Sequence, residues 1–97
     1  MSDISTRPTS YNITLTVANT EYSQLLPSGT KELRFRCRTL FDVRFAWVTG
    51  KVAGSADPYL TLPAGSDFFS DRKDISGKTL YLASTTAGVV IELCVWE

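Results

Sequence analysis

The chain has 97 residues, a length that fits a single domain with one modest hydrophobic core. Hydrophobic residues make up 43% of it, a share that argues against intrinsic disorder. The 10 basic and 10 acidic side chains cancel, so the chain has no net charge that would attract nucleic acid or an anionic membrane.

Residues 1–10 are polar and include Pro8, and we expect them to form an arm ahead of a single domain at residues 11–97. They lack the apolar segment of a signal peptide. No apolar run in the chain approaches the roughly 20 residues that span a bilayer. We therefore expect a soluble protein that is made in a cytoplasm and has no membrane partner.

The first predicted strands are short. Residues 11–17 alternate apolar side chains with polar ones, which is the period-two pattern of a half-buried strand. Residues 22–26 form a second extended segment, which a proline and a glycine stop.

The strongest strand signal is at residues 33–39, where apolar and basic side chains alternate. On a strand the arginines share one face, whereas on a helix they would spread around the cylinder. These arginines are Arg34, Arg36 and Arg38. Residues 43–48 predict the next strand, and the short segment between the two predicts a turn that joins antiparallel neighbours.

The second half of the chain continues in the same manner. Its segments are a loop at residues 50–58, extended stretches at residues 59–62 and 67–70, a turn-like stretch at residues 71–77, and strands at residues 78–84 and 89–96. Roughly seven or eight short strands without sustained helical periodicity predict an all-β fold. We expect an antiparallel β-sandwich of jelly-roll or Greek-key type.

A short internal echo accompanies this pattern. Leu26-Pro-Ser-Gly-Thr30 is similar to Leu62-Pro-Ala-Gly-Ser66, and a tyrosine precedes each of them, Tyr22 and Tyr59. Either the two halves repeat one structural device, or a common strand terminator occurs twice.

Residue types limit the chemistry that this chain offers. It has no histidine, which excludes Ser-His-Asp and Cys-His nucleophile systems and histidine metal sites. We predict that the protein is not an enzyme, with no catalytic residue, cofactor or metal site. The aspartates Asp67, Asp71 and Asp74 surround Arg72 and Lys73, so ion pairing or solvation explains this cluster better than calcium binding.

The two cysteines, Cys37 and Cys94, fit no short metal or redox motif. We interpret both as buried thiols, because a free cysteine behaves as a small hydrophobe. The sequence leaves a disulfide between them open.

Two sets of residues are candidates for a protein interface. The first is basic: Arg34, Arg36, Arg38 and Arg44 would form one face if their two strands pair. This face is either a docking surface for an anionic partner or a solvated face with internal pairs such as Arg36–Glu92. Nucleic acid is the weaker partner, because the chain is neutral and the face lacks stacking aromatic residues.

The second set lies on the last strand. Its odd-numbered residues form an apolar face, and the opposite face carries Val90, Cys94 and Trp96. Either a neighbouring subunit covers these side chains, or a loop or the N-terminal arm does.

The order of these features resembles that of small structural proteins of tailed bacteriophages. The matching segments are residues 13–17, Glu21-Tyr22, Leu26-Pro-Ser-Gly-Thr30, Phe35-Arg-Cys-Arg38, Leu62-Pro-Ala-Gly-Ser66, Leu80-Tyr-Leu82 and Ala87-Gly-Val-Val-Ile-Glu-Leu-Cys-Val-Trp96. The resemblance implies a virion protein of the phage head, a capsid decoration or cement protein that stabilises the shell. It implies a homo-oligomer, a trimer or a dimer, that binds the major capsid protein or another virion protein.

Two alternatives remain at this point. One is a virion component of the tail, neck or vertex. The other is a receptor- or carbohydrate-binding module, in which aromatic side chains provide a stacking platform. The aromatic candidates are Tyr11, Tyr22, Tyr59, Phe68 and Phe69.

Overall fold

A computed structural model describes residues 8–54, 58–70 and 77–96. They form β1 (Pro8–Leu15), β2 (Tyr22–Leu25), β3 (Glu32–Cys37), β4 (Val43–Ala46), β5 (Leu60–Leu62), β6 (Asp67–Ser70), β7 (Thr79–Ala83) and β8 (Val89–Trp96). No helix in the described residues could span a bilayer. The all-β prediction is confirmed.

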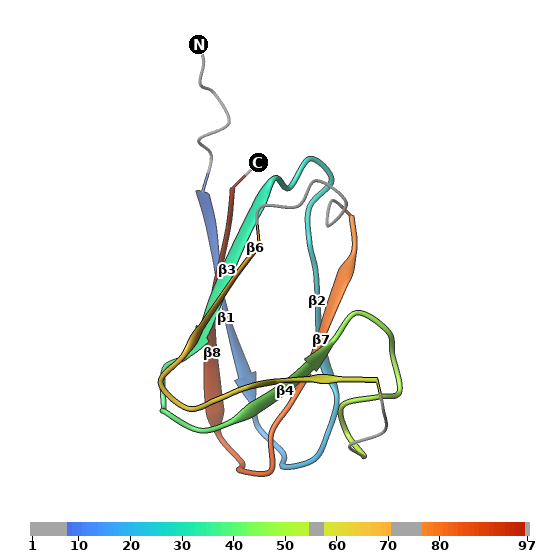
Figure 1. Ribbon diagram of the computed structural model, residues 1–97, viewed down its shortest axis with the longest axis vertical. Helices are drawn as coiled ribbons and strands as arrows, with labels where there is room; N and C mark the ends of the chain where they lie inside the picture. The colour runs from blue at the N-terminus through green and yellow to red at the C-terminus, as the bar shows by residue number, and fades with distance from the viewer. Residues whose placement is uncertain (1–7, 55–57, 71–76, 97) are drawn as a thin grey trace.

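The strands form two four-stranded sheets, which lie on the left and the right of Figure 1. Sheet A has the order β1-β8-β3-β6, and sheet B has the order β2-β7-β4-β5. The antiparallel pairs β1–β8, β2–β7, β3–β6 and β4–β5 show that the chain folds as one long hairpin with β4 and β5 at its tip. Rolling this hairpin so that its strand pairs alternate between two sheets produces a jelly roll, one of the two arrangements expected from the sequence.

The hydrophobic core lies between the two sheets and is built by period-two alternation. In both β3 and β8 every second side chain is buried, and these are the side chains that point toward the other sheet. Three aromatic rings connect the sheets: Phe35 and Phe68 from sheet A and Phe45 from sheet B. Their ring centroids are 4.9–5.2 Å apart. Such contacts add to the burial of each ring in holding the layers together.

The expected pairing of the third and fourth strands is wrong, because β3 and β4 lie in different sheets. Both sides of β3 are occupied, one by β8 and the other by β6, so β4 pairs with β7 and β5 instead. The connection crosses from sheet A to sheet B. Within it Leu40 has a φ of 60°, and the backbone N–H of Phe41 donates to the Cys37 sulfur at 3.4 Å.

The first strand begins three residues earlier than expected. Pro8, Thr9 and Ser10 pair with the end of β8 and are not part of an arm. Proline is tolerated here because β1 is an edge strand and Pro8 is its first residue. The rest of the expected arm, residues 1–7, lies outside the described residues, as do Asp71, Arg72, Lys73 and Asp74.

The two similar motifs form equivalent corners of the fold. Leu26-Pro-Ser-Gly-Thr30 connects β2 to β3, and Leu62-Pro-Ala-Gly-Ser66 connects β5 to β6, so each carries the chain from sheet B to sheet A. In each turn a backbone N–H donates to the proline carbonyl, from Thr30 at 3.2 Å and from Ser66 at 3.1 Å. Gly29 and Gly65 have φ values of 90° and 81°, as the third position of a type II turn requires. The echo is therefore a repeated structural device.

Candidate interaction surface

The outer face of sheet A gathers most of the candidate interface residues. Because side chains alternate along each strand, the even-numbered residues of β1, β3 and β8 point away from the core, together with Asp67 and Phe69 of β6. This face comprises Pro8, Ser10, Asn12, Thr14, Glu32, Arg34, Arg36, Arg38, Asp67, Phe69, Val90, Glu92, Cys94 and Trp96. Six of the seven predicted interface residues lie on it.

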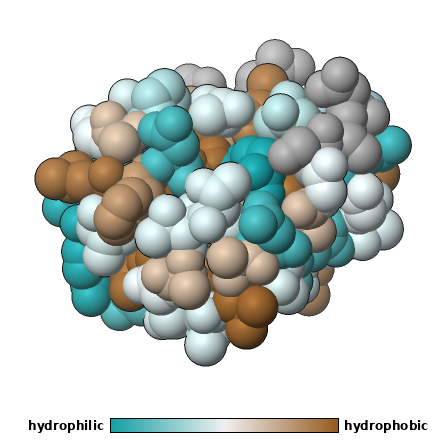
Figure 2. Space-filling view, turned by 90° about the horizontal axis from the view of Figure 1, so that it is seen from below, coloured by the Kyte–Doolittle hydropathy of each residue, from teal (hydrophilic) through white to brown (hydrophobic). Residues whose placement is uncertain are grey.

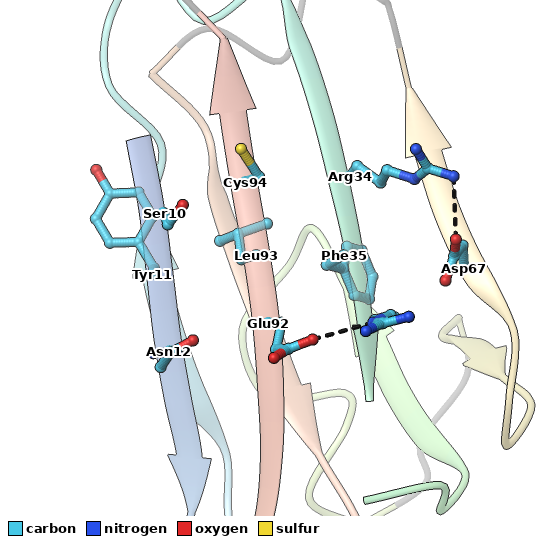
Figure 3. Close-up of a pocket in the computed structure, with 10 residues that line it drawn as sticks. Ser10, Tyr11, Asn12, Arg34, Phe35, Asp67, Glu92, Leu93 and Cys94 are labelled. Atoms are coloured by element: carbon cyan, nitrogen blue, oxygen red, sulfur yellow. Dashed lines mark hydrogen bonds and ion pairs between the residues drawn. The ribbon is translucent and has the colours of Figure 1, made fainter. Parts of the chain in front are cut away.

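Ion pairs cross this face between neighbouring strands. Arg34 of β3 pairs with Asp67 of β6 at 3.1 Å. Glu92 of β8 binds two arginines with its two carboxylate oxygens, Arg36 at 3.0 Å and Arg38 at 2.8 Å. Figure 3 shows Arg34 reaching Asp67 and Glu92 turned toward β3. The expected Arg36–Glu92 pair is confirmed, so this part of the basic face is compensated within the chain.

The pair of arginines changes the acidity of Glu92. The hydrogen bond from Arg38, followed by the one from Arg36, holds the pKa of the Glu92 carboxyl below its ordinary value of 4.5, because both stabilise the charged form. Glu92 therefore stays ionised into mildly acidic solution and keeps the two like charges from repelling each other across the face.

Apolar side chains lie among these ion pairs on the outer face of sheet A. Val90, Cys94 and Trp96 are half-buried, and Phe69 has 55% of its surface exposed. Cys94 is directly opposite Arg34, and Phe69 is opposite the same arginine on the other side. The face thus has three arginines, three carboxylates and a row of apolar groups.

A shallow depression of about 480 Å³ lies in the middle of the face (Figure 3). It follows β8 between β1 and β3, with Ser10 and Asn12 on one side and Arg34 and Asp67 on the other. Its lining mixes hydroxyl, amide, thiol and ion-paired groups. Such a lining offers a partner hydrogen-bonding sites that are already charge-balanced.

Arg44 does not join the basic face, so the prediction of a four-arginine surface is wrong. Arg44 lies in β4 of sheet B, where its guanidinium donates to the carbonyl of Val52 at 2.6 Å, the carbonyl of Ala53 at 3.4 Å and the side chain of Asn19 at 2.9 Å. These bonds fasten the β4–β5 loop over the outer face of sheet B. Val52 of this loop is buried against Ala46 and Ala83 of sheet B.

The cysteines point to opposite sides of sheet A and are both free. Cys37 is buried in the core, as expected. Cys94 is half-buried on the outer face, which differs from the prediction, because alternation along β8 sends its side chain away from the core.

The five aromatic candidates do not form one platform. Tyr11, Tyr22 and Phe68 pack against the main core, Tyr59 packs against the small cluster under the β4–β5 loop, and Phe69 lies on the outer face of sheet A. Tyr59 lines a separate apolar depression of about 310 Å³ beside Trp47. Figure 2 shows the lower end of the molecule, where apolar side chains emerge in separate groups among hydrophilic ones.

Two further members of the surface, Asp67 and Phe69, were expected in other roles. Asp67 was assigned to an acidic cluster and Phe69 to an aromatic platform, yet both face outward beside Arg36 and Arg34. The alternation of residues 67–70 is the signal that places them on one face. The described residues contain no group of three or more metal-ligating side chains.

No protein-family model matches the sequence, and no curated protein matches it. Among solved structures, the chain is similar to a de novo designed double-stranded β-helix that was solved by solution NMR. The TM-score is 0.55 at 14% identity, and the alignment covers 95% of this chain and 100% of the designed one. At this identity the likeness shows the fold alone, and it agrees with the rolled two-sheet arrangement.

Proposed function

We propose that this protein is a structural component of a phage particle, a homo-oligomeric capsid decoration protein that binds the major capsid protein through the outer face of sheet A. The observation that carries the proposal is the composition of this face. Exposed and half-buried apolar groups, Phe69 and Trp96 among them, share the face with arginines that already have carboxylate partners.

This composition favours a protein partner. Aromatic residues and arginine are enriched where proteins meet, and an ion pair formed in advance needs no counter-charge from the partner. Arg34, Arg36 and Arg38 are balanced by Glu32, Asp67 and Glu92 on the same face. The partner is therefore expected to bring apolar and hydrogen-bonding groups, rather than an acidic patch.

The overall charge fits a role in many copies. A neutral chain repels its neighbours little, so copies can pack closely on a lattice. Contacts that are weak singly become strong when an oligomer binds several sites at once. Jelly rolls occur in viral capsid proteins, lectins and cupins, so the fold permits this role without selecting it. The order of motifs that resembles small phage structural proteins is the supporting argument for the virion.

The test is co-sedimentation of the purified chain with capsids of the phage whose genome encodes it. We expect saturable, stoichiometric binding by the natural sequence. We expect at least about a tenfold loss of affinity in Phe69→Ser/Trp96→Ser, since two apolar anchors leave the face, one on edge strand β6 and one at the end of β8.

The matched control is Leu25→Ser, which removes an apolar side chain that is 61% exposed on sheet B. It is expected to bind as the natural sequence does. Absence of measurable occupancy would end the capsid proposal, and an equal loss in the control would move the interface away from sheet A.

A further inference from the structure

The first strand is an unusual edge. In the described residues β1 pairs with β8 on one side and with no strand on the other. It is eight residues long and contains no charged side chain. The other three edges are shorter: β2 and β6 have four residues each and β5 has three, and β6 carries Asp67. Protein edges are usually shortened, charged or interrupted by proline to prevent pairing with other chains, and of these protections β1 has only Pro8 at its first position.

The backbone groups that β1 presents can be assigned. Arg38 donates its N–H to the carbonyl of Val90 at 2.8 Å, so the even-numbered residues of β8 bond toward β3. Bonding direction alternates along an antiparallel strand, and the odd-numbered residues of β8 therefore bond toward β1. With the observed register, the N–H and C=O groups of Ser10, Asn12 and Thr14 point away from β8.

We propose that a second copy of this chain occupies that edge, with the two β1 strands antiparallel about a twofold axis at Asn12. In this register Asn12 faces the partner's Asn12, and Ser10 faces the partner's Thr14. About six backbone hydrogen bonds would form between the outward groups. A twofold arrangement uses the same surface on both copies and closes on itself, so it makes a dimer and not a filament.

The side chains of this register suit a second copy. On the outer face a hydroxyl pair forms between Ser10 and the partner's Thr14. On the inner face Tyr11 meets the partner's Ile13, an aromatic and β-branched pair of the kind that stabilises sheets. Both residues are only half-buried in one chain, where they lie at the open side of the core. The uncharged strand also brings no like charges together when it pairs with itself.

This pairing joins two copies of sheet A into one continuous sheet and places their outer faces side by side. The inference deepens the proposed function, because it names the edge through which the copies assemble and doubles the proposed capsid-binding face. Only the capsid-binding role of the joined faces rests on the proposed function, since the dimer would form without a capsid.

Amide hydrogen exchange, measured by NMR on the full chain, tests the pairing residue by residue. Below the dissociation constant we expect slow exchange at Tyr11 and Ile13, which bond to β8, and fast exchange at Ser10, Asn12 and Thr14. Above it, those three amides are expected to slow by at least about tenfold, because each then donates to the partner. A dimer in which they exchange as before would overturn the proposal.

Sedimentation equilibrium with one matched pair of variants completes the test. Asn12→Lys places two like charges at the axis and is expected to raise the dimer dissociation constant by about tenfold. Ser23→Lys, a substitution at another exposed position, on edge strand β2, is expected to leave it unchanged. Purely monomeric protein up to about 1 mM, or an equal effect of both variants, refutes the pairing. A stable dimer that ignores capsids would refute only the capsid role.

Discussion

Glu92 is the side chain on which the charge balance of the outer face depends. It accepts from two arginines that are separated by one residue on β3 and its extension, and the side chains of both are at least half exposed. A carboxylate held by two guanidinium groups is a charge-assisted arrangement, shorter and stronger than a neutral hydrogen bond.

The lowered pKa of Glu92 leads to a pH prediction. A carboxyl whose pKa is lower in the folded chain stabilises the fold above its unfolded value, near 4.5, and loses this contribution as the pH falls through the folded value. Chemical denaturation at pH 7 and pH 3 should therefore show a larger loss of stability for the natural sequence than for Glu92→Gln.

Two further measurements check the cause. Carbon-13 NMR titration of the Glu92 carboxyl should give a midpoint below 4.5, and about 1 M salt should move it upward by screening the exposed arginines. A midpoint at or above 4.5 at low salt would show that the two arginines do not hold this carboxylate in solution.

Arg44 differs from Arg34, Arg36 and Arg38 because it donates to backbone carbonyls of a loop and not to a carboxylate. Its guanidinium connects a strand to the carbonyls of Val52 and Ala53, so its removal leaves these acceptors without their donor. We predict that Arg44→Ala lowers the free energy of unfolding by about 2 kcal/mol, as expected for lost hydrogen bonds to a charged group. Urea denaturation measures the difference.

Arg34→Ala is the matched control for Arg44. It removes an arginine whose side chain is 59% exposed and whose partner is one aspartate, so its cost should stay below about 1 kcal/mol. Equal losses for the two variants would mean that the β4–β5 loop does not depend on Arg44.

Among the structural elements, the two Leu-Pro-X-Gly corners allow a paired prediction. Gly29 and Gly65 both have positive φ, and a Cβ added at either would contact nothing within 4 Å. The cost of alanine there comes only from the backbone conformation, and we predict a loss of about 1 kcal/mol of stability for Gly29→Ala and for Gly65→Ala alike.

Gly54→Ala provides the control for the corners. Gly54 also has open space around it but has no positive φ, so its substitution should change the free energy of unfolding by less than about 0.5 kcal/mol. Thermal or urea unfolding of the three variants measures these differences in the free energy of unfolding. Unequal losses at Gly29 and Gly65 would contradict the equivalence of the corners.

The strands themselves were largely predictable, because alternation is a local property of the sequence. Residues 33–39 identified β3 and its two faces. The Arg36–Glu92 pair was one example of internal pairing on an outward face, and the structure shows that the two residues lie opposite each other on neighbouring strands. Sheet membership was not predictable in the same way. Arg44 alternates with apolar residues just as Arg36 does, and nothing local shows that β4 joins the opposite sheet. A pattern of period two defines a face and leaves the pairing partner open.

For the whole molecule, the jelly roll explains how the two ends of the chain form one surface. The first and last strands pair along eight positions, and β8 lies between β1 and β3 in the middle of sheet A. Residues from positions 8 to 96 thereby share the face that we propose as the capsid contact. Several strands that are distant in sequence contribute to this face, so no short motif marks it.

Cryo-electron microscopy of the intact particle would show whether the outer face of sheet A binds the capsid, as we propose. The density should place copies of this chain on the shell with Phe69, Cys94 and Trp96 against the major capsid protein and sheet B turned toward solvent. Copies that meet the shell through sheet B, or particles from which the chain is absent, would show that the outer face of sheet A is not the capsid contact.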